Sequence, residues 1–303
     1  MGPSHHQRYD PRGVAAAGLA MVAWAGSGVL AKGIDMGGLV VVSYRMWIYV
    51  VVVVLWSWWR GRPLTRRALR VSLWGGLALG IDLALFFSAV KLTTVANATV
   101  IGAMQPVLAL VIGYHMFGER PRVSEVGLAV VAIGGVVLVV VGSAGAPQWS
   151  PLGDLAAFGA LVFFTAYFVF SKQSRSLIEA TEYTAATALI AALVNVPITL
   201  LSGQDLGPPS LASWIGLVLL AVGPGFIGHS LMNWSFGRIP LWLGSTFTLA
   251  LPVTASVLAW MFLGEQLSVP QAVGIAVVVL SLAGIVAGPS GGVALAVTET
   301  VGE

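Results

Sequence analysis

The sequence predicts an all-α integral membrane protein in which ten transmembrane helices form two inverted five-helix repeats. Its 303 residues are 57% hydrophobic and only 9% charged, whereas about a quarter of the residues in soluble domains are charged. Ten apolar runs joined by short loops follow one another along the chain. One of these runs occurs twice, 146 positions apart, with an interior proline and a terminal Gly-Glu at matching places.

Each apolar run is long enough to cross a bilayer, which takes about 20 helical residues. Nine runs follow the first one, so we interpret the first as a span and not as a cleaved signal peptide. The spans are expected at residues 13–31, 38–59, 68–90, 95–117, 123–143, 152–170, 182–201, 211–236, 240–263 and 269–288.

The duplicated run defines two repeats, because residues 96–119 recur as 242–265 and Pro252 takes the place of Pro106. The sequence predicts a cytoplasmic tail at 1–12, a first repeat at 13–143, a second repeat at 152–288 and another cytoplasmic tail at 289–303. Each repeat has five spans, an odd number, so equivalent spans run in opposite directions. Inverted repeats are typical of secondary transporters, which bind their substrate near the bilayer midplane.

The basic residues predict the orientation of the chain in the membrane. Twelve of the 15 Lys and Arg residues lie near span ends on one side: Arg8, Arg12, Arg60, Arg62, Arg66, Arg67, Arg70, Arg120, Arg122, Lys172, Arg175 and Arg238. Cytoplasmic loops carry such an excess, so both termini are expected inside. The tryptophans within residues 56–59 are interpreted as a cytoplasmic aromatic belt, and Lys32 and Lys172 as interfacial span ends.

Composition excludes several classes of protein. The net charge of +3 is small and scattered, which gives no basis for binding nucleic acid. The absence of cysteine excludes disulfides, thiolate metal sites and cysteine nucleophiles. The tail pair His5-His6 is too small for a metal site, and no metal or cofactor is expected. The expected partners are the lipid bilayer and a small-molecule substrate, and the sequence predicts no oligomeric state.

Three motifs in the first half have weaker echoes in the second. They are WAGSGVLAK at 24–32, Tyr44-Arg45 at the start of the second span, and the proline-centred fourth span that ends in GER at 118–120. With these motifs the chain resembles the EamA branch of the drug/metabolite transporter superfamily over about residues 13–288. The resemblance implies two EamA repeats in a bacterial plasma membrane and a carrier of small metabolites, often an exporter of amino acids or related compounds.

The alternatives to transport are an intramembrane enzyme and a non-transporting membrane receptor. The sequence has no H-E-x-x-H, G-x-S-x-G or P-loop motif, and a receptor would usually carry a soluble domain. Within the superfamily, small multidrug pumps carry a glutamate in their first span, which is absent here. Among the basic residues only Arg45 lies well inside a span, which is too little positive charge to neutralise the phosphate of a sugar phosphate. Neutral or zwitterionic metabolites, amino acids among them, therefore fit best.

Pro106 and Pro252 are expected to kink equivalent helices. Proline removes one backbone hydrogen bond and frees the carbonyl four residues earlier, here that of Gly102 or Thr248. In a membrane a freed carbonyl needs a partner or a wet cavity. The kinked helices are predicted to line the substrate cavity and to flex during transport; the alternative is a static kink satisfied by neighbouring helices.

Three charged or titratable residues lie well inside spans, away from the span ends. Asp82 is the one acidic residue deep in a span, and an intramembrane carboxylate is by default a functional candidate. It is the first candidate for proton coupling and His229 is the second, since histidine titrates near neutral pH. Arg45 could attract a substrate carboxylate. The alternatives are a neutral structural Asp82, a structural His229, and an Arg45 that reaches the outer surface.

Other polar or aromatic residues inside spans are candidates for lining the substrate cavity. His229 and Asn233 are four residues apart and share a helix face. The remaining candidates are Trp24, Ser27, Asn97, Gln105, Tyr167, Asn195 and Thr248. For each of them, packing or a hydrogen bond between helices is the alternative role.

The predicted topology can be tested with single cysteines introduced into this cysteine-free chain. In intact cells, a membrane-impermeant maleimide should label a cysteine at Gln148, because that loop is expected outside. It should not label a cysteine at Arg66 until the membrane is permeabilised. Labelling of the Arg66 position from outside, or protection of the Gln148 position, would reverse the predicted orientation.

Overall fold

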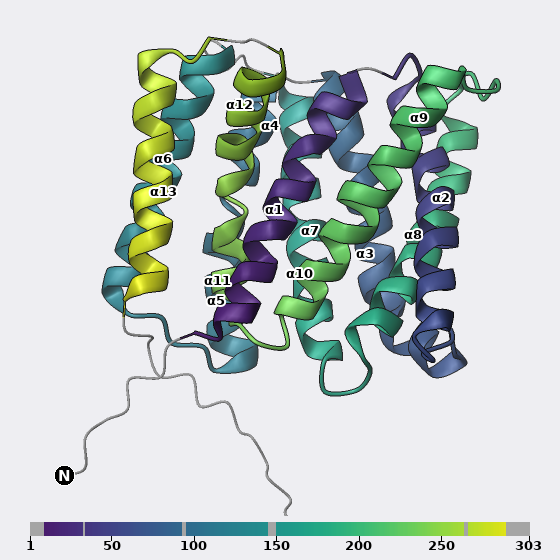
Figure 1. Cartoon of the computed structure of the whole chain (residues 1–303), viewed down its shortest axis with the longest axis horizontal. Coiled ribbons are helices and arrows are strands. Elements are labelled where there is room, and N and C mark those ends of the chain that lie inside the picture. The colour runs from purple at the N-terminus through teal and green to yellow at the C-terminus, as the bar shows by residue number, and fades with distance from the viewer. Residues whose placement is uncertain (1–8, 33, 93–94, 145–149, 264–265, 289–303) are drawn as a thin grey trace, which may run out of the picture.

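The computed structural model describes residues 9–32, 34–92, 95–144, 150–263 and 266–288, and their regular secondary structure is entirely helical (Figure 1). The first repeat comprises α1 (Pro11–Lys32), α2 (Gly38–Trp59), α3 (Arg66–Leu92), α4 (Val95–Gly102), α5 (Gln105–Phe117) and α6 (Val123–Ala144). The second comprises α7 (Pro151–Ser174), α8 (Ala180–Leu201), α9 (Leu211–Leu220), η1 (Ala221–Gly228), α10 (His229–Ser235), α11 (Leu241–Phe247), α12 (Ala250–Leu263) and α13 (Val269–Ala287).

These helices have the length and composition of membrane spans. Within the described residues, nine helices or helix combinations are long and apolar enough to cross a bilayer. The helix α1 adds a tenth, since its 22 residues extend about 33 Å at 1.5 Å per residue. The predicted all-helical membrane fold is therefore confirmed. Glu265 and both predicted tails apart from residues 9–12 lie outside the described residues, as does the side chain of Asn97.

The two proline-containing spans are broken at equivalent positions. The fourth span divides into α4 and α5 at Ala103-Met104, and the ninth divides into α11 and α12 at Thr248-Leu249. Proline has no backbone N–H and clashes with the preceding turn, so the first turn of a helix accommodates it best. The carbonyl of Thr248 accepts a bond from the Leu251 N–H at 3.0 Å. At both expected kinks a short turn interrupts the α-helix, and a new helix follows it.

The broken spans run in opposite directions. In Figure 1, α4 and α12 lie toward the upper side of the molecule and α5 and α11 toward the lower side. The chain therefore passes downward through α4 and α5 but upward through α11 and α12. This is the antiparallel relation that five-span repeats predict.

The two repeats pack together in an approximately symmetric way, so that equivalent spans make equivalent contacts with the other repeat. The first span of each repeat packs against the third span of the other: α1 against η1 and α10, and α7 against α3. The second spans, α2 and α8, pack together, and so do the fifth spans, α6 and α13. Each repeat therefore completes its packing only with the other repeat.

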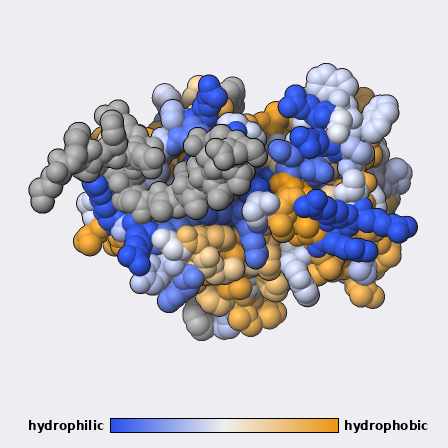
Figure 2. Space-filling model, turned by 90° about the horizontal axis from the view of Figure 1, so that it is seen from below, coloured by the Kyte–Doolittle hydropathy of each residue, from blue (hydrophilic) through white to orange (hydrophobic). Residues whose placement is uncertain are grey.

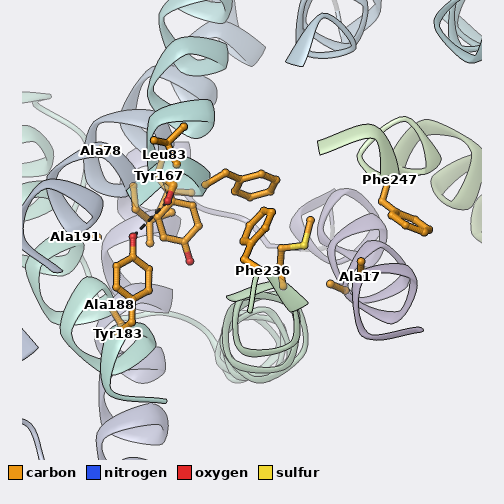
Figure 3. Close-up of a cluster of buried hydrophobic side chains, with 14 of the residues drawn as sticks. Ala17, Ala78, Leu83, Tyr167, Tyr183, Ala188, Ala191, Phe236 and Phe247 are labelled. Carbon is orange, nitrogen blue, oxygen red and sulfur yellow. Dashed lines mark hydrogen bonds between the residues drawn. The ribbon is translucent and has the colours of Figure 1, made fainter. Parts of the chain in front are cut away.

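A buried aromatic core lies between the repeats. It includes Tyr49, Tyr167, Phe168, Tyr183 and Phe236. Figure 3 shows Tyr183 beside Tyr167, with its hydroxyl donating to the Tyr167 carbonyl at 3.3 Å, and Phe236 nearby. This core joins α2, α7 and α8 to the turn at the end of α10.

Glycine permits the close contact between α6 and α13. A Cβ added to Gly135 would lie 2.9 Å from a methyl of Val278 and 3.0 Å from the carbonyl oxygen of Gly274. A Cβ on the adjacent Gly134 would meet no atom within 4 Å. Small residues let membrane helices approach closely in this way.

Neighbouring glycines therefore provide a matched test of this packing. Gly135→Ala should destabilise the protein by about 1–3 kcal/mol, the usual cost of overpacking. Gly134→Ala should be neutral or slightly stabilising, because alanine favours a helix by about 1 kcal/mol relative to glycine. Thermal unfolding in detergent would measure both changes. Equal stability of the two variants would contradict the close approach of α6 and α13.

Candidate functional site

Side chains from both repeats meet at His229, the first residue of α10. Tyr49 from α2 stacks on the imidazole with ring centroids 5.9 Å apart. Trp24 from α1 and Tyr167 from α7 approach it edge-on, with centroids at 5.1 and 5.6 Å. We call these four residues and Asn233 the His229 cluster. The sequence alone predicts all of them as candidates except Tyr49, which is an aromatic residue in an otherwise apolar span.

Asn233 organises a buried hydrogen-bond network at this cluster. Its Nδ2 donates to the Tyr167 hydroxyl at 2.8 Å and to Thr184 Oγ1 at 2.9 Å. Its Oδ1 accepts from Ser171 Oγ at 2.7 Å. The Tyr167 hydroxyl also lies 3.3 Å from His229 Nδ1. A buried network in which the members satisfy one another holds its side chains rigidly, so the imidazole and phenol have defined positions.

A π-helix brings His229 to this place. The segment η1 contains Pro224 between two glycines, and π-turns are frequent at functional sites. The indole N–H of Trp24 donates to the Pro224 carbonyl at 3.0 Å. The backbone of Gly228 lies so close to Trp24 that an added Cβ would be 2.5 Å from the indole nitrogen. Sequence analysis expected one continuous helix here, although the Gly-Pro-Gly at 223–225 was a usable signal.

Arg45 and Asp82 are two buried ionisable residues of the first repeat that lie near the cluster. Arg45 is only 5% exposed and Asp82 7%, and the two interact electrostatically. Arg45 also interacts electrostatically with His229 and Tyr49. Asp82 interacts in the same way with Tyr167. Arg45 lies 5.9 Å from the ring centroid of Phe87. Its guanidinium is in the interior, so the alternative that it extends to the outer surface is wrong.

Polar groups also lie at the helix breaks. Gln105 begins α5 and is buried, with no hydrogen-bond partner for Nε2 in the described part of the chain. Thr248 donates to the carbonyl of Ser245 at 2.6 Å. Ala103 and Leu249 belong to one apolar cluster, so the two breaks lie in a common packing region.

The other candidates do not join the His229 cluster. Asn195 Nδ2 donates to the carbonyls of Gly80 at 3.2 Å and Ala191 at 2.9 Å, which ties α8 to α3 and matches the structural alternative. Ser27 is half-buried on α1. Pro106 and Pro252 lie in the first turns of α5 and α12.

A buried ion pair closes the lower side of the molecule, near the end of α5. Lys172 Nζ lies 3.3 Å from Glu119 Oε1 and donates to the Ile239 carbonyl at 2.9 Å. Glu119 also accepts the backbone N–H groups of Leu241 at 2.7 Å and Trp242 at 3.1 Å. We call Glu119, Lys172 and the backbone of residues 239–242 the Glu119 clasp.

The clasp corrects the interfacial placement of Lys172. The side chains of Lys172 and Glu119 are only 16% and 2% exposed, because the lysine turns inward to the carboxylate. Gly118 has φ 64°, a left-handed conformation that glycine adopts without strain and that ends α5. The clasp thereby joins the end of one broken span to the start of the other.

Two repeats of membrane-spanning helices, each with an interrupted fourth span, are typical of membrane transport proteins. The sequence profile described as the EamA-like transporter family matches residues 11–141 and again residues 151–287. The chain belongs to this family, within the drug/metabolite transporter superfamily, and the resemblance is confirmed. Its family and relatives are transporters, which points away from an enzyme.

Individual relatives agree with this membership. The chain is 30% identical over 213 residues to the uncharacterized transporter YwfM of Bacillus subtilis, covering 68% of this chain and 69% of that protein. It is 28% identical over 179 residues to the aromatic amino acid exporter YddG of Ancylobacter novellus, covering 57% and 60%. A crystal structure with 22% identity shares the fold, with a TM-score of 0.80 over 89% of this chain and 95% of that one.

Proposed function

We propose that this chain is a secondary transporter that exports small zwitterionic metabolites, with amino acids that carry apolar or aromatic side chains as the main candidates. The observation that supports this function is the His229 cluster beside the Arg45 and Asp82 pair. Small-molecule sites combine apolar and aromatic walls with a few fixed polar groups. Aromatic rings suit an apolar side chain, and a guanidinium suits a carboxylate.

With Asp82 ionised, Arg45 and Asp82 would match the two charges of an amino acid. Arg45 would receive the carboxylate of the substrate, and Asp82 would receive its ammonium group. Neither buried charge would then be left without a partner, a state that costs several kcal/mol. The 28% identity to an aromatic amino acid exporter supports an aromatic substrate.

Alternating access would use the Glu119 clasp and the helix breaks. The positive-inside rule assigns the clasp to the cytoplasmic side, so an exporter must open it to admit substrate. A hydrogen bond to a charged group contributes about 1.5–3 kcal/mol, and Glu119 accepts two such bonds besides its lysine contact. Opening therefore costs several kcal/mol, which substrate binding would offset, with the breaks before Pro106 and Pro252 as the points of bending.

Counterflow in proteoliposomes tests the substrate class. Vesicles loaded with unlabelled phenylalanine or tryptophan should accumulate the labelled amino acid through the wild-type protein. Tyr167→Phe removes the hydroxyl that is bound to Asn233 and lies 3.3 Å from His229 Nδ1. Uptake should then fall roughly ten-fold, which corresponds to a lost interaction of about 1.4 kcal/mol. The exposed Trp58→Phe should behave like the wild type.

Two results of the counterflow assay would contradict this proposal. Absence of counterflow with every common amino acid, from protein that unfolds cooperatively in detergent, would reject the proposed substrate class. Normal counterflow in Tyr167→Phe would keep the class but remove the His229 cluster from the substrate path.

Asp82 is proposed as the proton-coupling residue. A proton on Asp82 would compete with the ammonium of the substrate, so inward proton movement would drive export. Asp82→Asn should still catalyse exchange, with a higher KM, but should lose accumulation driven by a pH gradient. Asp35→Asn, which changes an exposed carboxylate, is the control.

Gradient-driven accumulation that persists in Asp82→Asn would eliminate Asp82 as the coupling residue. His229→Gln would then be the next variant to assay, because His229 is the second candidate. Loss of exchange as well as accumulation, in folded protein, would assign Asp82 to substrate binding alone.

A further inference from the structure

A second polar site lies away from the His229 cluster, at the lower end of the molecule. A pocket of about 520 Å³ opens there between three connections: α2 to α3, α7 to α8, and α10 to α11. Figure 2 views this end of the molecule from below and shows strongly hydrophilic residues gathered on it. The positive-inside rule assigns this end to the cytoplasm.

The pocket carries an excess of positive charge. Its charged lining residues are Arg62, Arg67, Arg175, Arg238, Glu179 and Glu182. The two glutamates are already engaged in capping α8, where Glu182 accepts the Glu179 N–H at 2.9 Å. The Arg62–Glu179 pair is long, at 3.9 Å, and exposed, so it offsets little of the charge. Arg238 Nε also lies 3.7 Å from Asp10 Oδ2, in a partly exposed pair that offsets little as well. The arginines therefore favour an anion.

Two of the arginines are held in place with donors to spare. Arg175 donates from Nε to the Ser171 carbonyl at 3.2 Å and from Nη2 to Ser174 Oγ at 2.8 Å. Its buried Nη1 has no partner in the described part of the chain. The Arg238 guanidinium carbon lies 3.5 Å from the ring centroid of Trp234. Planar guanidinium groups fixed in this way suit the oxygens of a phosphate.

The surrounding tryptophans indicate at which depth of the membrane the pocket lies. Trp58 and Trp59 are 71% and 70% exposed at the end of α2, just before Arg60 and Arg62. Trp234 lines the pocket itself. Tryptophan gathers at the level of lipid head groups, so the pocket lies where phospholipid phosphates are concentrated.

We propose that this pocket binds a phosphate-bearing anion, supplied by the head group of an anionic phospholipid in the cytoplasmic leaflet. Basic pockets on the cytoplasmic side of membrane proteins bind such head groups. Arg62 and Arg67 come from the first repeat and Arg175 and Arg238 from the second, so the bound lipid would join both repeats. Arg175 follows Lys172 by one helical turn and Arg238 immediately precedes Ile239, which places the lipid next to the Glu119 clasp. The lipid would stabilise the conformation with the clasp closed.

The test compares two pairs of exposed arginines. Arg62→Gln/Arg67→Gln removes two pocket arginines, whereas Arg66→Gln/Arg70→Gln removes the same charge from α3 outside the pocket. Phosphatidylglycerol and phosphatidylcholine are titrated against each purified protein, with retained lipid followed by native mass spectrometry and unfolding followed by Tm. Wild type and the control pair should retain phosphatidylglycerol and gain Tm. The pocket pair should bind it roughly ten-fold more weakly for each bond lost.

Inorganic phosphate separates the two sources of the anion. If phosphate alone raises Tm in wild type but not in the pocket pair, and displaces phosphatidylglycerol at millimolar concentration, the site takes a free anion and the lipid proposal is overturned. Equal losses in both arginine pairs, or equal retention of phosphatidylcholine by wild type, would also overturn it. Arg175→Gln should reproduce the loss if that variant keeps the wild-type Tm without lipid.

Discussion

Every backbone polar group inside a bilayer needs a partner, and this constraint governs the whole structure. Unbroken helices meet it within themselves, which is why the chain is built almost wholly from them. The described chain departs from regular α-helix inside three spans: between α4 and α5, in η1, and between α11 and α12. A proline is present at each departure, and polar side chains lie close to each.

The Glu119 clasp provides partners for backbone groups at the start of a helix, where the same constraint applies. The first N–H groups of α11 have no partner within their own helix, and the carboxylate of Glu119 accepts two of them. A negative charge is favourable at a helix N-terminus, and Lys172 balances that charge. The Glu119 side chain thus satisfies two backbone N–H groups of α11, pairs with a buried lysine and links the two repeats. Any movement that separates α5 from α11 must give up the two backbone bonds to Glu119.

The two repeats share a plan but differ at the site. Both fourth spans break before a proline at the same offset, and the spans pack in exchanged pairs. The π-helix belongs to the second repeat alone: position 78, which corresponds to Pro224, is alanine within the continuous helix α3. The first repeat instead contributes Asp82 from that helix. Ionisable residues of the first repeat and the histidine of the second therefore lie near one another.

The sequence by itself determined the helical membrane fold, the repeat and the position of both breaks, because hydrophobic run length and proline chemistry are local properties. It also identified most of the His229 cluster, since polar residues are costly in lipid. Only tertiary structure decided which of them meet. Tyr49 became part of the site, Asn195 became a tie between helices, and Lys172 turned inward, because each outcome depends on a neighbour far away in the chain. The partner that satisfies a buried polar group is chosen by packing, and no local pattern encodes that choice.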